Sequence, residues 1–422
     1  MPNADQLQNK TLIIGGGIIG LSTAIELAKS GVQVTLLEKN EVGRGCSYGN
    51  AGWLTPCFAL PLPMPGLFFR SIGWLFNPNG PLYIQPSFSL DLQRWLLRFV
   101  SSMTMTKAIP ATEFLVKLSM LSLEIYKNLA IEFPEEFSFQ QKGLLMVAES
   151  GTGVKSVQQE LDFVKRFGVS GAVLNPEEIK HLEPALIGKY LGAVYFENEA
   201  HVEPFQLIQV LKKKALKLGV DILEHHELTD FETHNDQIVS VHSNAKVFSA
   251  QNFILATGAW SKKLGKSLGL SIPILGGKGY SMLVPQGGQP LAHPVMVIDR
   301  KLAMSPYKNK IRIAGTLELV DQDFSLNRRR AQILLDGANT HLNIQQAQSL
   351  DQVEDLWYGL RPCTPDGLPM MGYSNRFKNL VIATGHQMLG VQAGAGSGLA
   401  LANLILNKPN LIDLKLANPN RF

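Results

Sequence analysis

Residues 12–39 read LIIGGGIIGLSTAIELAKSGVQVTLLEK, and their alternation of apolar runs and glycines predicts a strand, a tight turn, a helix and a second strand. Gly15, Gly17 and Gly20 form the pattern G-x-G-x-x-G, and Glu38 ends the second strand. In such a βαβ unit the first glycine permits the turn, the second lets a pyrophosphate approach the backbone, and the third lets helix and strand pack closely. An acid at the end of the second strand accepts hydrogen bonds from ribose hydroxyls. The segment therefore predicts a dinucleotide site.

Length and composition fit an ordinary globular protein. The chain has 422 residues, which leaves room for two or three domains, and it is 45% hydrophobic and 18% charged. A net charge of +4 is too diffuse to indicate nucleic acid binding. Cys46, Cys57 and Cys363 form no CxxC pair and no metal-ligand cluster, so we expect no disulfide, no metal site and a reducing compartment.

The first apolar run, at Leu12, is the cofactor strand itself, so we expect no signal peptide. Residues 57–76, CFALPLPMPGLFFRSIGWLF, are the nearest approach to a membrane span, but three prolines and Arg70 interrupt them. We expect a cytoplasmic protein. A buried loop between domains and a peripheral contact with the inner face of the membrane both remain open for residues 57–76.

The remaining periodicity predicts an interleaved organisation. We expect helices within 87–135, 151–168, 203–218 and 328–342, strands at 139–147, 192–197, 220–223, 278–284, 302–306 and 310–316, and a hairpin at 228–248. Residues 253–260, FILATGAW, read as a strand that returns to the nucleotide sheet. We therefore assign residues 10–55, 200–275 and 355–408 to a cofactor domain, and residues 56–199 and 276–354 to a substrate domain.

A second glycine-rich region lies near the end of the chain. Residues 380–401 read LVIATGHQMLGVQAGAGSGLAL, which predicts a strand, a glycine loop from Gly385 to Gly398, and a helix. One dinucleotide needs only one helix N-terminus for its pyrophosphate. A second one suits a flavin, whose N1 and C2 carbonyl gain negative charge on reduction, so this region favours FAD over NAD.

Residues 358–372, YGLRPCTPDGLPMMG, place Arg361 close in sequence to that loop. A guanidinium there can bind a substrate carboxylate through two hydrogen bonds. A structural ion pair with an acid such as Asp366 is the alternative. The aspartate itself is more typical of a turn than of a general base.

Together the opening LLEK unit, SYGNAGWLTP, ATGAW, GLRPCTPDGLPMMG and ATGHQMLGVQAGAGSG resemble the FAD-dependent D-amino acid oxidase/dehydrogenase superfamily. The nearest likeness is to bacterial D-amino acid dehydrogenases and the related hydroxyproline dehydrogenases and glycine oxidases. The resemblance implies an α/β protein in which a Rossmann-like FAD-binding domain interleaves with an α+β substrate domain on a mixed, mostly antiparallel sheet. It also implies hydride transfer from a substrate Cα to flavin N5, followed by hydrolysis of the imine to a 2-oxo acid. The electron acceptor is then a quinone, a carrier or O2.

The resemblance also implies roles for matching residues. The expected FAD contacts are Gly15, Gly17, Ile18, Ile19, Gly20, Glu38, Lys39, Ser47, Asn50, Ala51, Gly52, Thr257, Gly258, Trp260, Gly385, His386, Met388, Leu389 and Gly390. Arg361 matches the carboxylate-binding arginine, whereas Tyr280 and Tyr307 are either pocket residues or ordinary sheet tyrosines. Relatives that attach FAD to a cysteine carry it further before the TPD turn than Cys363, so we expect non-covalent FAD. The loop VQAGAGSG lacks the usual aromatic residue, which leaves substrate and acceptor open.

Three functions follow. The favoured one is a D-amino acid dehydrogenase or oxidase for small apolar or imino acids. The second is an enzyme of the same fold that acts on glycine, sarcosine or D-hydroxyproline. The third is an FAD-holding subunit of an electron-transfer complex without a substrate site, which would have no need of Arg361. A low-dielectric site can lower the pKa of the substrate amine, so we name no general base.

Overall fold

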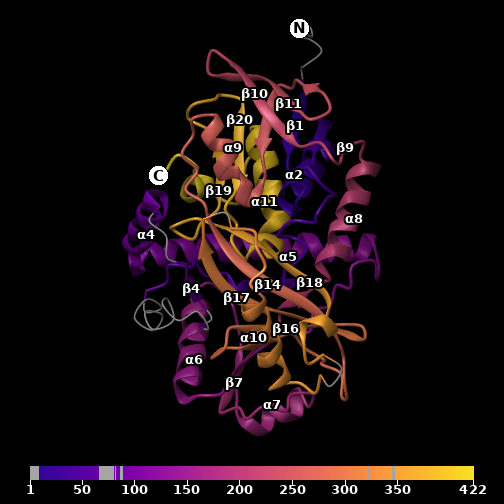
Figure 1. Ribbon diagram of the computed structural model, residues 1–422, viewed down its shortest axis with the longest axis vertical. Helices are drawn as coiled ribbons and strands as arrows, with labels where there is room; N and C mark the ends of the chain where they lie inside the picture. Colours follow the sequence, from indigo (N-terminus) through magenta and orange to yellow (C-terminus); the bar gives the residue numbers. More distant parts are fainter. Residues whose placement is uncertain (1–8, 66–79, 81, 86–88, 322, 345–346) are drawn as a thin grey trace.

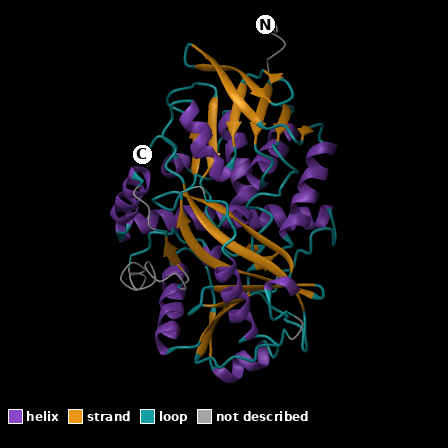
Figure 2. Cartoon of the chain, in the orientation of Figure 1, coloured by secondary structure: helices purple, strands orange, loops and turns teal. Residues whose placement is uncertain are grey.

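The computed structural model describes residues 9–65, 80, 82–85, 89–321, 323–344 and 347–422. Figure 1 shows two lobes, each built around one large sheet, and the chain passes between them several times. In Figure 2 helices run between the two groups of strands. The α/β class and the interleaving of the two parts are thus confirmed.

The upper lobe contains a six-stranded sheet in the order β19-β20-β13-β1-β2-β9, in which only the β19–β20 pair is antiparallel. Its strands are β1 (Lys10–Ile14), β2 (Gln33–Leu37), β9 (Asp221–Leu223), β13 (Asn252–Leu255), β19 (Met370–Tyr373) and β20 (Leu380–Thr384). Its helices are α2 (Ile18–Lys29), α5 (Met105–Glu132), α8 (Pro204–Lys217), α9 (Ser261–Ser267) and α11 (Gly390–Ile405), with β10 (Leu228–His234), β11 (Gln237–Ser243) and β12 (Val247–Phe248) as a separate small sheet.

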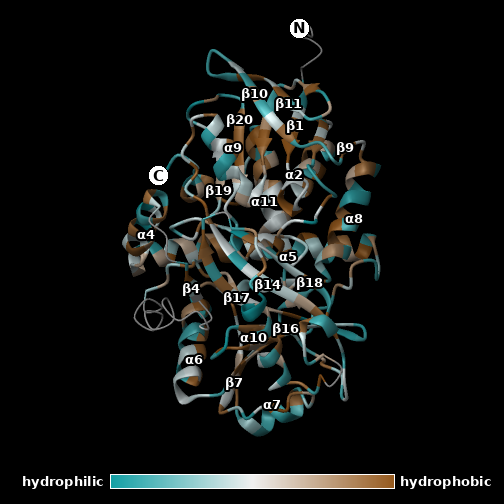
Figure 3. Ribbon diagram, in the orientation of Figure 1, coloured by the Kyte–Doolittle hydropathy of each residue, from teal (hydrophilic) through white to brown (hydrophobic). Residues whose placement is uncertain are grey.

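Both faces of the six-stranded sheet are covered. Ile13 of β1 packs in the core that α2, α8 and α11 share, whereas Leu12 and Ile14 pack in a second core with β11 and β12. Burial on both sides explains why these strands read as continuous apolar runs. They form the brown centre of the upper lobe in Figure 3.

The glycine run near the C-terminus folds differently from the expectation. Residues up to Gly398 were expected to form a loop, but α11 already begins at Gly390. A Cβ on Gly396 would lie 2.7 Å from the Leu118 carbonyl oxygen, and one on Gly398 would lie 2.6 Å from Cβ of Ser22. These glycines therefore let α11 pack closely against α5 and α2, so close packing, and not a loop, is their structural role.

The lower lobe contains a larger sheet in the order β18-β14-β17-β16-β15-β5-β7-β6, with β4 beside β17. Its strands are β4 (Leu82–Ile84), β5 (Leu144–Ala148), β6 (Ala172–Leu174), β7 (Gly192–Phe196), β14 (Leu275–Pro285), β15 (Val295–Val297), β16 (Leu302–Tyr307), β17 (Lys310–Val320) and β18 (Glu354–Cys363). Its helices are α4 (Leu90–Ser102), α6 (Gly151–Lys165), α7 (Pro176–Leu182) and α10 (Arg328–Asn339). Only the β15–β5 and β17–β4 pairs are parallel, so the sheet is mixed and mostly antiparallel as expected.

Two segments pack with the domain other than the one to which the sequence assigned them. Residues 355–363 were grouped with the cofactor domain, but β18 pairs with β14 in the lower sheet. Residues 105–132 were grouped with the substrate domain, but α5 shares its apolar core with α11 and α2. Neither shift was visible in the sequence, because both depend on pairing with segments far away in the chain.

The apolar stretch 57–76 is described only in part. Pro56–Phe58 form the short 3-10 helix η1, and Cys57 is buried, whereas residues 66–76 lie outside the described residues. In the part of the chain that the structure describes, no helix is both long enough and apolar enough to cross a bilayer.

Candidate active site

A cavity of about 500 Å³ runs along the carboxyl ends of the upper strands, where ligands bind in open α/β sheets. It is lined by most of the expected cofactor contacts, namely Gly15, Gly17, Ile18, Ile19, Glu38, Lys39, Ser47, Asn50, Thr257, Gly258, Trp260, Gly385, His386 and Gly390. The structure thus gathers residues from three distant parts of the chain around one space of cofactor size.

The three glycines of the opening motif have three different surroundings. A Cβ on Gly15, which has a φ of 111°, would lie 2.5 Å from the Ala256 carbonyl oxygen. A Cβ on Gly20 would lie 2.0 Å from the carbonyl oxygen of Gly15. Gly17 lines the cavity instead, and its Cβ would meet only the Ser47 hydroxyl, at 3.5 Å. Gly15 and Gly20 therefore serve the turn and the packing, and Gly17 leaves the space that a pyrophosphate needs.

Glu38 is held at one side of this cavity. Its carboxylate accepts hydrogen bonds from the backbone N–H of Gly16 at 2.8 Å and of Asn40 at 3.0 Å. Lys39 Nζ lies 4.0 Å from the ring centroid of Trp260. The N-cap residues of α2 and α11 make no side-chain cap, although the Ser47 hydroxyl accepts from the Ile18 N–H at 3.2 Å, and both termini border the cavity. Glu38 fits a ribose, the N-terminus of α2 fits a pyrophosphate, and the N-terminus of α11 fits a ring that gains negative charge.

A second cavity, of about 290 Å³, adjoins the first. The two share Asn50, and Met388 and Leu389 of the second directly precede Gly390 of the first. The second cavity has mostly apolar walls, contributed by Trp53, Phe58, Leu96, Phe99, Met296, Leu317 and Leu319, and it contains Arg361. A substrate bound there would lie next to the cofactor cavity.

The lower sheet is shaped around Arg361. The pairing of β14 with β17 shifts register between Lys278 and Tyr280, so Thr316 belongs to a β-bulge and has a φ of 54°. The bulge presents the Thr316 carbonyl oxygen to Nη1 of Arg361, at 2.9 Å. On β14, a Cβ at Gly279 would lie 2.0 Å from the same Nη1. Bulges often re-aim groups beside active sites, and a positive φ in a β-branched residue is rare.

Arg361 makes no ion pair within the described residues. The alternative partner, Asp366, pairs instead with Arg421 at 2.6 Å. Burial lowers the pKa of Arg361, although a guanidinium stays charged at any ordinary pH. A cation without an ion-pair partner among the described residues, in a mostly apolar cavity, fits an anionic ligand group.

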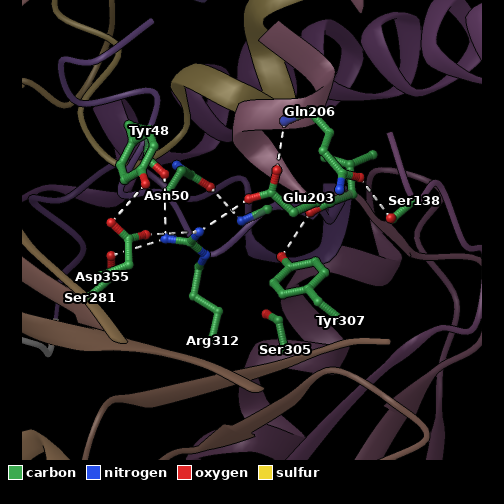
Figure 4. Close-up of polar contacts among 12 residues, drawn as sticks. Tyr48, Asn50, Ser138, Glu203, Gln206, Ser281, Ser305, Tyr307, Arg312 and Asp355 are labelled. Atoms are coloured by element: carbon green, nitrogen blue, oxygen red, sulfur yellow. Dashed lines mark hydrogen bonds and ion pairs between the residues drawn. The ribbon is translucent and has the colours of Figure 1, made fainter. Parts of the chain in front are cut away.

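The loop from Ser47 to Gly52 is held by a network of polar contacts, which Figure 4 shows around Tyr48 and Asn50. Arg312, which is 1% exposed, reaches from β17 to Glu203 at 3.1 Å and to Asp355 at 3.7 Å. Asp355 accepts a hydrogen bond from the Tyr48 hydroxyl at 2.7 Å. Asn50 donates to the Met388 carbonyl oxygen at 3.0 Å, which ties this loop to the segment before α11. The network sets the loop relative to both cavities.

The two candidate tyrosines line neither cavity. Tyr280 is buried in the lower core, and its hydroxyl donates to Glu318 at 2.6 Å. The Tyr307 hydroxyl lies 2.7 Å from the carbonyl oxygens of both Ala51 and Val202. Both are sheet tyrosines, the second of the two expectations, and Tyr307 braces the loop that carries Ala51 and Gly52.

His386 is a wall of the first cavity. Its Nε2 lies 3.0 Å from the Ser397 hydroxyl, and burial lowers its pKa to about 3. It therefore stays neutral at physiological pH and is a poor proton acceptor. Cys46 lines the same cavity, and burial raises the pKa of its thiol to about 12. This thiol is not activated as a nucleophile.

Several residues at the site were not singled out from the sequence. They are Gly279, Thr316, Arg312, Glu203, Asp355, Glu160 and Lys301. Of these, only Gly279 had a sequence signal, because the GKG triplet at the start of an expected strand is typical of a site where another group approaches the backbone. The others come together through long-range pairing, which a single sequence does not reveal.

One family model matches almost the whole chain. Residues 10–404 match the model of the FAD dependent oxidoreductase family, which covers both cavities. The chain belongs to this family.

Solved structures show how widely the fold of this FAD-dependent oxidoreductase is shared. Glycine oxidase from Geobacillus kaustophilus superimposes with a TM-score of 0.77 at 23% identity, covering 98% of each chain. L-proline dehydrogenase from P. horikoshii gives 0.76 at 21% identity, covering 98% of this chain and 97% of that one. Iminodiacetate oxidase from Chelativorans sp. BNC1 gives 0.73 at 20% identity, covering 97% and 98%. At these identities the likeness shows the fold.

FAD is the cofactor of this FAD-dependent oxidoreductase, and the first cavity fits it. The open face of Gly17, the carboxylate of Glu38 and the uncapped start of α11 are the groups that would contact its pyrophosphate, ribose and ring. Ala51, Met388 and Leu389 line the second cavity, at the boundary between the two spaces. Gly20 and Gly52 line neither cavity and serve packing instead.

Proposed function

We propose that this protein oxidises the Cα–N bond of an amino or imino acid, in first place a D-amino acid, and releases the imino or 2-oxo acid. The observation that carries the proposal is Arg361, a cation without an acid partner in the described structure, in a cavity that adjoins the FAD cavity. A subunit that only holds FAD needs no such residue.

The roles of the residues follow from their surroundings. Arg361 would bind the substrate carboxylate through two hydrogen bonds, and the bulge at Thr316 would fix its orientation. The apolar walls exclude water and lower the pKa of the bound ammonium group, so that a neutral amine is available without a dedicated base. Bound FAD, which we take to be non-covalent, supplies the acceptor for the hydride that leaves Cα.

The named neighbours support an amine that carries a carboxylate. Their names give glycine, proline and iminodiacetate as the compounds on which they act, and each of these compounds has both groups. Since both L-proline dehydrogenase and glycine oxidase share the fold, the D-configuration rests on the sequence resemblance. Glycine, sarcosine and D-hydroxyproline are the alternatives within the same chemistry.

The electron acceptor is part of the same proposal. It is a quinone, a carrier or O2, and the quinone alternative would bring the cytoplasmic protein to the membrane surface through residues 57–76. Residues 66–76 of this stretch lie outside the described residues.

Anaerobic mixing of the purified holoenzyme with candidate substrates tests the proposal. The panel holds both enantiomers of apolar amino acids and proline, glycine, sarcosine and the hydroxyproline epimers, and the readout is the loss of flavin absorbance at roughly 450 nm. Bleaching by an amino or imino acid is the expected result, and the reacting compound names the substrate. A holoenzyme that none of them bleaches would overturn the proposal in favour of an FAD-holding subunit.

A further inference from the structure

The second cavity contains two charged side chains that binding of a carboxylate by Arg361 does not use. Among the described residues, its charged and amide- or hydroxyl-bearing lining side chains are Arg361, Thr316, Asn50, Gln392, Glu160 and Lys301. Asn50 and Gln392 are committed to protein partners, because Asn50 donates to Met388 and Gln392 donates to Ser119 at 3.1 Å. Glu160 and Lys301 remain to be explained.

Glu160 faces this cavity from α6. Its Oε1 is buried and has no hydrogen-bond partner among the described residues. Burial raises the pKa of Glu160, and the charge of Lys301 partly opposes that effect. A buried polar atom without a partner costs free energy, so such an atom in a ligand cavity indicates that a ligand supplies the missing bond.

Lys301 lines the same cavity and directly precedes β16. Glu160 Oε1 has no hydrogen-bond partner among the described residues, and Lys301 is close enough to Glu160 to interact with it electrostatically. Arg361 lies on β18, with β14 and β17 between it and β16. The cavity therefore contains Arg361, whose neighbour Pro362 lines the first cavity, and two opposite charges elsewhere along its mostly apolar walls.

The opposite charges of Glu160 and Lys301 limit the kind of ligand group that can bind between them. A cationic group would be attracted by Glu160 and repelled by Lys301, and an anionic group would meet the reverse. A neutral group that donates to the carboxylate and accepts from the ammonium satisfies both side chains at once.

We propose that Glu160 and Lys301 together select a substrate whose apolar side chain ends in a neutral hydroxyl or carboxamide. This inference rests on the proposed function, because it takes Arg361 as the site of the carboxylate. Glu160 accepts the hydrogen of that terminal group and Lys301 donates to its oxygen, and both act as specificity-determining residues.

Equilibrium binding of carboxylates that cannot be oxidised at Cα–N tests the inference. Calorimetric titration of the holoenzyme compares 3-(4-hydroxyphenyl)propionate with 3-phenylpropionate, and 4-carbamoylbutanoate with 5-methylhexanoate. Within each pair only the terminal group differs. We expect the polar member of at least one pair to bind about tenfold more tightly, the effect of a hydrogen bond to a charged group.

Variants assign that preference to the two residues. Glu160→Gln and Lys301→Met should each reduce it to about threefold or less, because each removes one charged partner. Asp162→Asn is the control on the same helix, since its side chain is 77% exposed. Lys308→Met is the control for Lys301, because both lysines have a φ of 52° and Lys308 is exposed.

The results separate this inference from the proposed function. An equal affinity for both members of each pair in the wild type, or a preference that survives both variants, overturns the role of Glu160 and Lys301 even when amino acids bleach the flavin. A preference that both variants remove supports their role, and it does so whether or not a tested amino acid reduces FAD.

Discussion

Nη1 of Arg361 donates to the carbonyl oxygen of Thr316 at 2.9 Å, at a bulge where Thr316 has a φ of 54°. Three strands contribute to this arrangement: β18 supplies the arginine, β17 the bulge, and β14 the space at Gly279. The side chain that we assign to the substrate carboxylate is therefore oriented by the sheet before a substrate arrives. Such preorganisation reduces the entropy lost on binding.

Gly279→Ala should displace the guanidinium without unfolding the protein. The new Cβ would lie 2.0 to 2.2 Å from three atoms of the Arg361 guanidinium, which is the movable end of a long side chain. We expect KM for the substrate to rise about tenfold or more, because a misplaced anchor loses its hydrogen bonds, while the FAD content stays unchanged. Steady-state kinetics checks this, with Gly151→Ala, which meets no atom within 4 Å, as the control. An unchanged KM would contradict the role of Gly279.

Glu38→Gln should weaken FAD binding. The carboxylate lies at the cofactor cavity and would accept from the ribose hydroxyls, and charge-assisted hydrogen bonds are about twice as strong as neutral ones. We expect the Kd for FAD to rise about tenfold, measured by fluorescence titration of the apoprotein. Glu113→Gln, at a half-exposed pair with Lys117, should leave the Kd unchanged. Equal affinities for the two variants would place the ribose elsewhere.

Arg312→Met should destabilise the contact between the lobes. Its guanidinium is buried between Glu203 and Asp355, and removing one partner of a buried ion pair costs about 3–5 kcal/mol. We expect a loss of that order in the free energy of unfolding of the holoprotein, measured in urea. The double variant Arg312→Met/Glu203→Gln should recover part of it, because the acid is then no longer left unpaired. No recovery would show that the two side chains are not coupled.

Glu199 should make the protein less stable as the pH rises from about 4.5 to about 8. Burial raises its pKa from 4.5 to about 8, so the native state keeps a proton that the unfolded chain releases. Its contribution to stability is complete below about pH 4.5 and is lost, by about 1.4 kcal/mol per pH unit, as the pH rises to about 8. Denaturation of the wild type and Glu199→Gln at pH 5, 6, 7 and 8 checks this. A difference between them that does not change with pH would contradict the prediction.

The cofactor half of the site was predictable because its signals are local. Gly15, Gly17, Gly20 and Glu38 lie within one βαβ unit, and each position has a backbone or hydrogen-bonding reason that spacing alone reveals. The glycine run from Gly385 to Gly398 was harder to interpret from the sequence, because glycine occurs both in loops and where two helices pack closely. Only the contact of α11 with α5 and α2 distinguishes the two.

The substrate half was predictable only at Arg361. Its orientation depends on the bulge at Thr316, and the sequence carries no sign of a positive φ in a β-branched residue. Glu160 and Lys301 come from segments that are 141 residues apart and share one cavity only after the lower sheet has formed. Tyr280 and Tyr307 were plausible pocket residues in the sequence, but in the structure their hydroxyl groups donate hydrogen bonds to other groups of the protein.

Arg361 provides the most direct test of the central claim that the enzyme oxidises an amino or imino acid held by its carboxylate. Stopped-flow reduction of the flavin should be measured for wild type, Arg361→Lys and Arg361→Met, with the reacting amino acid and with the amine that lacks its carboxylate. We predict that Arg361→Met lowers the efficiency of reduction by the amino acid about a hundredfold, that Arg361→Lys lowers it less, and that the slow reaction with the amine is unchanged. Reduction of Arg361→Met by the amino acid at the wild-type rate and affinity would contradict the account.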